Sequence, residues 1–365
     1  MKKVVRRNLL GLSVVLVVFF GVIPGYIDQN KNSVSTVPPH PKPVYYDSIP
    51  FIADLHCDEL LWDRDLLKEI SYGHVDLPRM QRANMAFQVF TVVSKVPFGI
   101  NIEQNDSNSD QIALLSFVQL RPPSNWFSVK KRALQQCENL ADFAEASEGK
   151  LRVIKNRGDL ERFMADRAKD HSITSGMLGL EGAQPLEGNL DNLKTFYDAG
   201  VRYIGLAHFF FNVFAGSAHG MKKGGLTSLG KELIQKMTDL HITIDLAHAS
   251  SQTIDDVLAV HNGPVLVSHT GVKGVCDNQR NLSDAHLIAI GQHQGLVGIG
   301  LWETAVCGTD AAATAKSIRY VADKIGVDKV ALGSDWDGAF RMHFDVTGTP
   351  RIVAELEKLK FTRPE

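Results

Sequence analysis

Two neighbouring segments decide the fold: Thr243-Ile244-Asp245-Leu246-Ala247-His248 and Pro264-Val265-Leu266-Val267-Ser268-His269. Each is a short, mostly apolar run that ends in a histidine, and a stretch with helical spacing, Thr253–His261, lies between them. Near-continuous apolar runs are typical of strands that are buried on both faces. A strand, a helix and a second strand in this order predict a parallel sheet.

Six further runs of the same kind flank this pair: Phe51–His56, Ala86–Val93, Met177–Glu181, Val201–His208, Leu296–Trp302 and Val330–Asp335. Helical spacing separates most of them, as in Leu226–Leu240, Ser283–His293 and Ala311–Ile325. Strand and helix alternating about eight times predict an α/β fold of the (β/α)8 or TIM-barrel type. A doubly wound open sheet gives the same local signals, but no GxGxxG turn follows the first run, which disfavours a dinucleotide-binding sheet.

The polar residues at the ends of these runs favour the barrel. Six of the eight runs finish in residues that bind metals or move protons: His56 with Asp58, Glu181, His208, His248, His269 and Asp335. Barrel enzymes assemble their active sites at the carboxyl ends of the strands. Thirteen histidines scattered at random would not be expected to place four at such ends. The sequence therefore predicts a metal or acid–base site at one rim of the barrel.

Each of these residues also has an ordinary structural interpretation when it is taken alone. His56 and Asp58 are two positions apart, which places both on one face of a strand, but such a pair is common by chance. Glu181 lies in an apolar run and needs a cation, which a salt bridge would supply as well as a metal. Buried histidines often bind backbone carbonyls, and Asp335 precedes an Asp-Gly turn. All of these interpretations would have to hold at once, which disfavours them.

Composition excludes several classes of protein. The 365 residues are 44% hydrophobic and 22% charged, as in an ordinary globular enzyme rather than a disordered or multi-span membrane chain. Lys and Arg number 39 against 41 Asp and Glu, so there is no basic excess for binding nucleic acid. Four cysteines without a CxxC pair are typical neither of a disulfide scaffold nor of a cysteine zinc site.

The amino terminus predicts export or anchoring. Lys2, Lys3, Arg6 and Arg7 precede an uncharged stretch from Asn8 to Ile27. We interpret residues 1–27 as a signal peptide or an uncleaved membrane anchor that places the body on the non-cytoplasmic side, periplasmic or extracellular. The small-x-small candidate for cleavage, Ser33-Val34-Ser35, lies far out, so both alternatives stay open. Residues 28–50, rich in Pro, Ser and Asn, predict a flexible linker, and residues 51–365 the catalytic domain.

Several ordered motifs resemble those of the membrane dipeptidase (renal dipeptidase) family of zinc peptidases. The resemblance runs from about Phe51 to Glu357 and is carried by six marks: Asp54-Leu55-His56-Cys57-Asp58, Glu181-Gly182-Ala183, Gly230 through Ile244-Asp245-Leu246-Ala247-His248, Val267-Ser268-His269, Gln279-Arg280-Asn281 and Gly333-Ser334-Asp335-Trp336-Asp337-Gly338. That family has an amidohydrolase-type barrel with two zinc ions, acts on dipeptides and often forms homodimers.

The resemblance implies a role for each residue. His56 and Asp58 would hold one Zn2+, His248 and His269 the other, and Glu181 would bridge the two ions. His208 would contact the reacting carbonyl, and Asp335 would transfer the proton. Arg280 would bind the substrate carboxylate, since a guanidinium fork matches a carboxylate. Asp245 or Asp337 would orient the chelating histidines.

Three departures from the family pattern affect these expectations. Trp302 stands where the family often has a substrate-contacting tyrosine, so it is expected to line the pocket and change its shape. Cys276 and Cys307 flank that region, and their spacing leaves open whether they form a disulfide. The chain stops at Glu365, where the family usually continues into further helices, so the domain is expected to be truncated or its last helix incomplete.

Two rival functions remain. One is another two-metal hydrolase of this barrel class, acting on N-acyl amino acids, lactones or phosphoesters. Some of those use a modified lysine at the end of the fourth strand, where this chain has Leu206-Ala207-His208. The other is a non-catalytic barrel that keeps the metal site.

Overall fold

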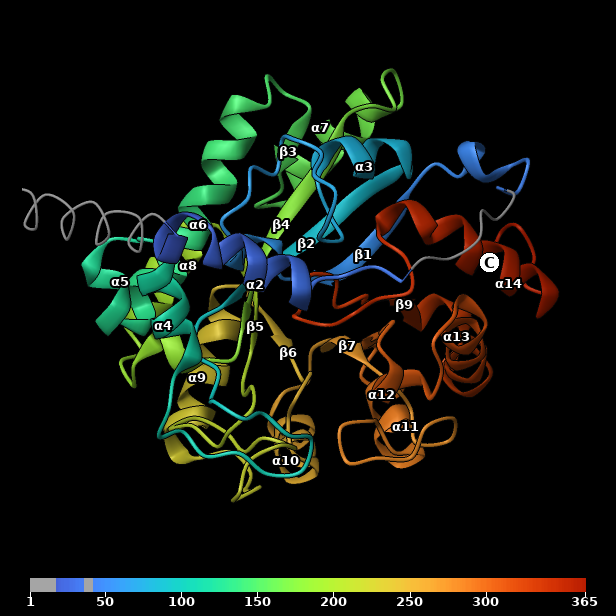
Figure 1. Ribbon diagram of the computed structural model, residues 1–365. Helices are drawn as coiled ribbons and strands as arrows, with labels where there is room; N and C mark the ends of the chain where they lie inside the picture. The colour runs from blue at the N-terminus through green and yellow to red at the C-terminus, as the bar shows by residue number, and fades with distance from the viewer. Residues whose placement is uncertain (1–17, 36–41) are drawn as a thin grey trace, which may run out of the picture.

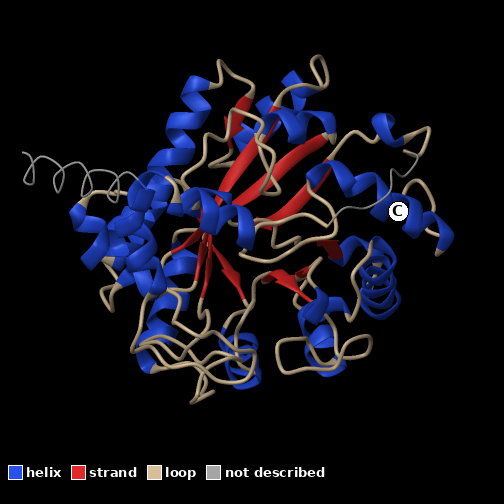
Figure 2. Ribbon diagram, viewed as in Figure 1, coloured by secondary structure: helices blue, strands red, loops and turns tan. Residues whose placement is uncertain are grey.

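The computed structural model describes residues 18–35 and 42–365, and its centre is a closed ring of eight parallel strands (Figures 1 and 2). The ring consists of β1 (Ile52–Cys57), β2 (Met85–Val93), β4 (Thr174–Glu181), β5 (Val201–Gly205), β6 (Thr243–Asp245), β7 (Leu266–Thr270), β8 (Leu296–Ile299) and β9 (Val330–Leu332). Pairing of Asp54 with Leu332 and of Phe87 with Ser175 closes it. The predicted (β/α)8 barrel is confirmed, and all eight predicted runs contribute a strand.

A ninth strand, β3 (Leu151–Val153), was not predicted from the sequence. It lies outside the ring and pairs in parallel with the start of β4, Leu151 opposite Thr174. The strand is three residues long, and Arg152 in its middle is exposed. So short a segment carries too little apolar periodicity to stand out.

Helices cover the outside of the ring (Figure 2). Their bounds are α2 Ile23–Lys31, α3 Leu77–Arg82, α4 Gln111–Val118, α5 Pro123–Phe127, α6 Val129–Ala146, α7 Arg157–Arg167, α8 Asn192–Ala199, α9 Ser228–Asp239, α10 Ser251–Val260, α11 Asp284–Gln292, α12 Glu303–Val306, α13 Ala311–Ile325 and α14 Thr349–Lys358. Side chains that accept bonds from first-turn N–H groups begin many of them, for example Ser250 for α10 and Ser283 for α11. α14 follows β9 and packs against α13.

Side chains fill the interior of the ring, so the barrel is a packed core and not a pore. Tyr203 is fully buried, and its hydroxyl donates to the carbonyl of Leu55 on the far side of the ring (3.1 Å). A Cβ at Gly179 would lie 2.2 Å from the Tyr203 ring, so only glycine leaves room for it there.

The chain before the barrel is fastened to the carboxyl rim. Asp28 of α2 pairs with Arg64 (3.1 Å), and Arg64 also pairs with Asp337 (2.9 Å). Val34 forms a parallel bridge with Met342. Residues 1–17, which hold most of the predicted signal or anchor, lie outside the described residues. Within the described ranges, none of the helices combines the length and the hydropathy needed to cross a bilayer.

Candidate active site

The structure brings the six predicted strand-end positions together at the carboxyl rim. His56 lies in β1, Glu181 ends β4 and His269 lies in β7. The loops directly after β1, β5, β6 and β9 supply the remaining four residues, which are Asp58, His208, His248 and Asp335. All seven side chains are at least nine-tenths buried. Residues as far apart in the sequence as His56 and Asp335 thus meet at one end of the barrel, because every ring strand points the same way.

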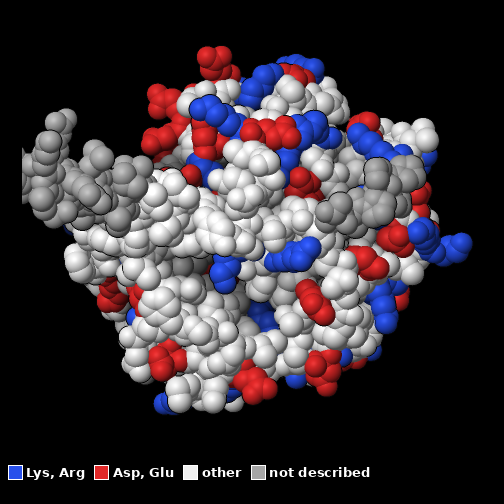
Figure 3. Space-filling model, viewed as in Figure 1, with Lys and Arg blue, Asp and Glu red and all other residues white. Residues whose placement is uncertain are grey.

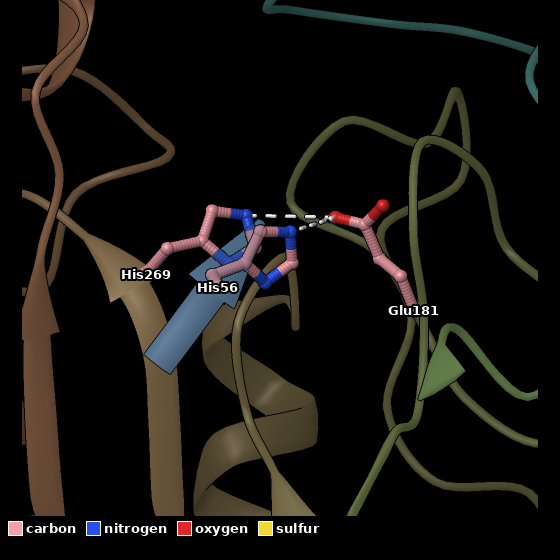
Figure 4. Close-up of side chains that lie close together, drawn as sticks. All are labelled: His56, Glu181 and His269. Carbon is pink, nitrogen blue, oxygen red and sulfur yellow. Dashed lines mark ion pairs between the residues drawn. The ribbon is translucent and has the colours of Figure 1, made fainter. Parts of the chain in front are cut away.

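Glu181 is the centre of the cluster. Its Oε1 lies 3.1 Å from Nε2 of His248, 3.5 Å from Nε2 of His269 and 3.6 Å from Nε2 of His56. Its other oxygen, Oε2, lies 3.3 Å from Nε2 of His208. Figure 4 shows the His56 and His269 rings side by side, both directed at this carboxylate. One carboxylate therefore reaches imidazoles from four strands.

His56 has carboxylates around the same nitrogen. Nε2 lies 3.3 Å from Oδ1 of Asp58 and 3.8 Å from Oδ1 of Asp335. The hydroxyl of Thr91 donates to Asp58 and also to the carbonyl of Cys57 (2.8 Å). The Asp58 side chain is thereby held toward His56, as the two-residue spacing predicts.

Ligand atoms converge in three overlapping groups: His56–Glu181–His269, Glu181–His208–His248 and His56–Asp58–Asp335. Within each group the possible ligand atoms lie within 4.8 Å of one another. Nε2 of His56 is buried without a hydrogen-bond partner, and Nε2 of His248 and of His269 face each other at 2.9 Å. Imidazole nitrogens turned toward carboxylates and toward each other are the donor set that divalent metal ions use.

The pKa directions show how unfavourable this crowding is without a cation. Burial, reinforced by the charge of Asp58, raises the pKa of Glu181 well above its usual range. Burial raises the pKa of Asp335 to about 8. Burial disfavours the charged form of His56, but the carboxylates of Asp58, Glu181 and Asp335 outweigh it and raise its pKa to about 10. Bound metal ions would supply the positive charge that these acids lack.

A second layer of hydrogen bonds fixes the ring of His269. The hydroxyl of Ser268 donates to Asp245 (2.7 Å), so it accepts from Nδ1 of His269 at 3.0 Å. This leaves the Nε2 lone pair of His269 free to face Glu181. The expectation for Asp245 thus has a contact to support it, through Ser268. Asp337 instead pairs with Arg64 and accepts from the backbone N–H of His74 (2.8 Å).

Two of the site residues have left-handed backbones. His248 has φ 61° and Asp335 has φ 63°, a region that residues other than glycine seldom adopt. The backbone of Asp335 is held there by a bond from its N–H to the carbonyl of His56 (3.2 Å). The sharp turn of the backbone after each strand directs the His248 and Asp335 side chains into the site.

Arg280 and Trp302 form one wall of the site. Arg280 is 7% exposed, and its guanidinium donates to the carbonyl of His269 (2.7 Å) and the hydroxyl of Thr270 (3.3 Å). Burial lowers its pKa to about 10. The Trp302 ring lies 5.7 Å from the His269 ring and 5.8 Å from Cζ of Arg280. The positive charge is thereby fixed beside the histidine cluster.

Cys276 and Cys307, which are 31 positions apart in the sequence, form a disulfide beside this wall. It joins the loop that carries Arg280 to the helix that begins after Trp302. Cys57, between the proposed ligands His56 and Asp58 in the sequence, is fully buried with its sulfur 3.9 Å from Asp337.

Replacing both Cys276 and Cys307 by serine is expected to lower the free energy of unfolding by about 3 kcal/mol, since the bond closes a medium-length loop. Chemical denaturation of the variant and of the wild type would measure this. The matched control is Cys137→Ser, which removes a buried cysteine that forms no disulfide. An equal loss in both variants would contradict the contribution of the cross-link.

Three polar residues of the site were missed from the sequence. Thr91 and Ser268 lie one layer behind the ligands, and Ser268 directly precedes His269, which is the one signal that could have identified it. His219 lies on the loop after β5, with Nδ1 2.8 Å from the carbonyl of Ile102 and its ring 5.2 Å from that of His248. Nε2 of His219 is buried without a partner, so it is available to a bound molecule.

Comparisons with known proteins agree with this geometry. The profile of the membrane dipeptidase family, peptidase family M19, matches residues 48–365. A Klebsiella pneumoniae protein from the pqqA 5' region is 30% identical over 237 residues, which are 61% of this chain and 86% of that protein. Mouse dipeptidase 3 is 30% identical over 205 residues, 53% of this chain but only 41% of the mouse protein.

A solved structure is similar over most of the chain. The metallopeptidase from Rhodobacter sphaeroides, crystallised with a phosphinate mimic of L-Ala-D-Ala, superposes with a TM-score of 0.70 and 26% identity, covering 86% of this chain and 94% of that one. The family match covers the whole barrel and every residue of the candidate site. The chain belongs to the membrane dipeptidase family and is a hydrolase of the metallo-dipeptidase class.

Proposed function

We propose that this chain hydrolyses the peptide bond of dipeptides outside the cytoplasm, using two zinc ions. His56 and Asp58 would hold one ion, His248 and His269 the other, and Glu181 would lie between them. The observation that carries the proposal is the position of the Glu181 carboxylate, within 3.6 Å of the Nε2 atoms of His56, His248 and His269. Zinc ions held there would supply an activated water and polarise the scissile carbonyl.

The chain's own residues supply the remaining functions. Asp335, whose Oδ1 lies 3.8 Å from Nε2 of His56, would take up the proton of the attacking water and return it to the leaving amine. His208, held by Glu181 on one side, would donate to the oxygen of the reacting carbonyl. Arg280 would bind the free carboxylate of the dipeptide, with Trp302 packed beside it.

Metal analysis combined with a dipeptide panel tests the proposal. The purified wild-type chain is expected to hold about two equivalents of zinc and to cleave dipeptides. His248→Ala is expected to lose metal and activity together, while His286→Ala, at a histidine on α11, should keep both. A wild type that binds no metal and cleaves no dipeptide with zinc added would favour the non-catalytic barrel.

Arg280→Ala separates the dipeptidase from the rival two-metal hydrolases. Loss of a buried charge-assisted contact is expected to raise KM for dipeptides about 100-fold, roughly 3 kcal/mol. KM for the same dipeptides with an amidated carboxyl end should change much less, because they lack the charge that Arg280 would bind. Equal effects on both substrates would contradict recognition of the carboxylate.

We further propose that the amino-terminal segment is retained as an anchor and that the barrel lies on the non-cytoplasmic side. Asp28 and Val34 bind Arg64 and Met342 of the body, contacts that a cut at Ser33-Val34-Ser35 would remove. The disulfide supports an oxidising compartment. Mass spectrometry of the protein from its own membranes would detect residues 18–35 if the anchor is retained. Sizing in detergent would test the homodimer that the resemblance implies.

A further inference from the structure

The helix pair α4–α5 exposes an uncharged surface. Between residues 111 and 127 the sequence has a single charged residue, Arg121, and that one pairs with Asp63 (3.2 Å). Leu114 is 50% exposed, Leu120 62% and Phe127 87%. Clusters of large apolar side chains on one exposed surface mark binding sites in folded proteins.

The amino-terminal chain arrives at the same surface. The Phe20 ring lies 5.5 Å from the Phe117 ring of α4, and Val18, Phe19 and Val22 beside it are exposed. Figure 1 shows the start of the described chain next to α4 and α5, and Figure 3 shows that region almost wholly without charged side chains. We call Val18, Phe19, Val22, Leu114, Leu120 and Phe127 the apolar face.

We propose that the apolar face rests in the interfacial layer of a lipid bilayer, next to the point where the amino-terminal segment enters it. The inference depends on the membrane attachment proposed above. Four cations precede an uncharged run that starts at Asn8 and continues past Phe20. Phe20 packs on Phe117 of α4. A bilayer that holds the uncharged run must therefore come within about the length of one side chain of α4.

Trp126 of α5 is the kind of residue expected in the interfacial layer of a bilayer. Its ring packs 4.9 Å from Phe117, and its Nε1 donates to the carbonyl of Arg121 (2.8 Å). Tryptophan, whose ring is largely apolar but carries one polar N–H group, is enriched at membrane interfaces. The other three tryptophans, Trp62, Trp302 and Trp336, are buried, so Trp126 is the one that lipid can reach.

Fluorescence quenching by brominated lipid tests the proposal. The full chain is reconstituted into phosphatidylcholine–phosphatidylglycerol vesicles with ordinary or brominated acyl chains, and vesicle-bound protein is isolated by flotation. Bromine is expected to quench the emission of the wild type, and Trp126→Phe should abolish that quenching. Leu120→Glu with Phe127→Glu should still float and cleave dipeptides but lose most of the quenching. Val44→Glu with Val260→Glu, at exposed apolar positions elsewhere, should behave as the wild type.

The outcomes separate the two proposals. A wild type that does not float overturns both the attachment and the membrane contact of the apolar face. A wild type that floats with equal emission in both vesicle types overturns the contact alone. If Leu120→Glu with Phe127→Glu instead converts a dimer in detergent to a monomer, the face pairs two copies of the chain and the bilayer contact is wrong.

Discussion

Replacing Glu181 by glutamine is expected to lower kcat for dipeptides about 10³-fold and to reduce the bound metal sharply. The carboxylate lies close to four imidazoles: His56, His248 and His269 face Oε1, and His208 faces Oε2, so its negative charge serves every proposed ligand histidine. Glutamine keeps the shape but presents an N–H₂ group where a cation should lie. Metal analysis and steady-state kinetics on the same preparation would measure both effects.

Glu187→Gln provides the control for this variant. Glu187 lies on the same β4–α8 connection but is exposed, and it accepts from the hydroxyl of Ser128 (3.1 Å). It should keep full activity and full metal content. If Glu181→Gln retained both as well, the shared carboxylate would have no role in holding the ions, and the proposed mechanism would be wrong.

Asp335→Asn is expected to lower kcat by about 10³-fold while leaving most of the metal bound, because an amide cannot carry the proton between water and amine. KM should change little, since Arg280 rather than Asp335 would bind the substrate. Asp328→Asn, at an exposed position before β9, is the control for the substitution itself. Loss of metal in Asp335→Asn would instead identify Asp335 as a ligand, an arrangement that its place beside His56 and Asp58 allows.

The barrel and the convergence of the ligands could be predicted because both follow from local pattern. Each ring strand is an apolar run, and parallel strands bring their carboxyl ends to one rim, so a polar residue at position 56 and another at 335 had to meet. The hydrophobic pattern of the sequence could not predict contacts between segments that have no periodicity. Thr91, Ser268 and His219 act through a few side-chain hydrogen bonds to other segments, and β3 is too short to show a recognisable sequence pattern.

The amino-terminal region shows the same limit. Its composition predicts a spacer over residues 28–50, yet Asp28 and Val34 contact the body. The pairing of Asp28 with the Arg64 side chain and the backbone bonds of Ser33 and Ser35 to Met342 hold this segment, and residues 23–35 alone do not identify those partners. Whether Cys276 and Cys307 pair is likewise set by the fold, which brings their Cα atoms to 5.2 Å.

Closure of the ring by β1 and β9 has a kinetic consequence. Asp54 pairs with Leu332, and both the N–H and the hydroxyl of Ser334 donate to Asp54 (2.7 and 2.8 Å), so the seam joins segments about 280 positions apart. Contacts so distant along the chain form late in folding. His56 and Asp335 lie on the two sides of that seam, so the proposed metal ligand and the proposed proton-transfer carboxylate meet only after the last strand has docked. Recovery of dipeptidase activity by a refolding chain should therefore lag behind the appearance of helical signal, and its rate would time the final step of assembly.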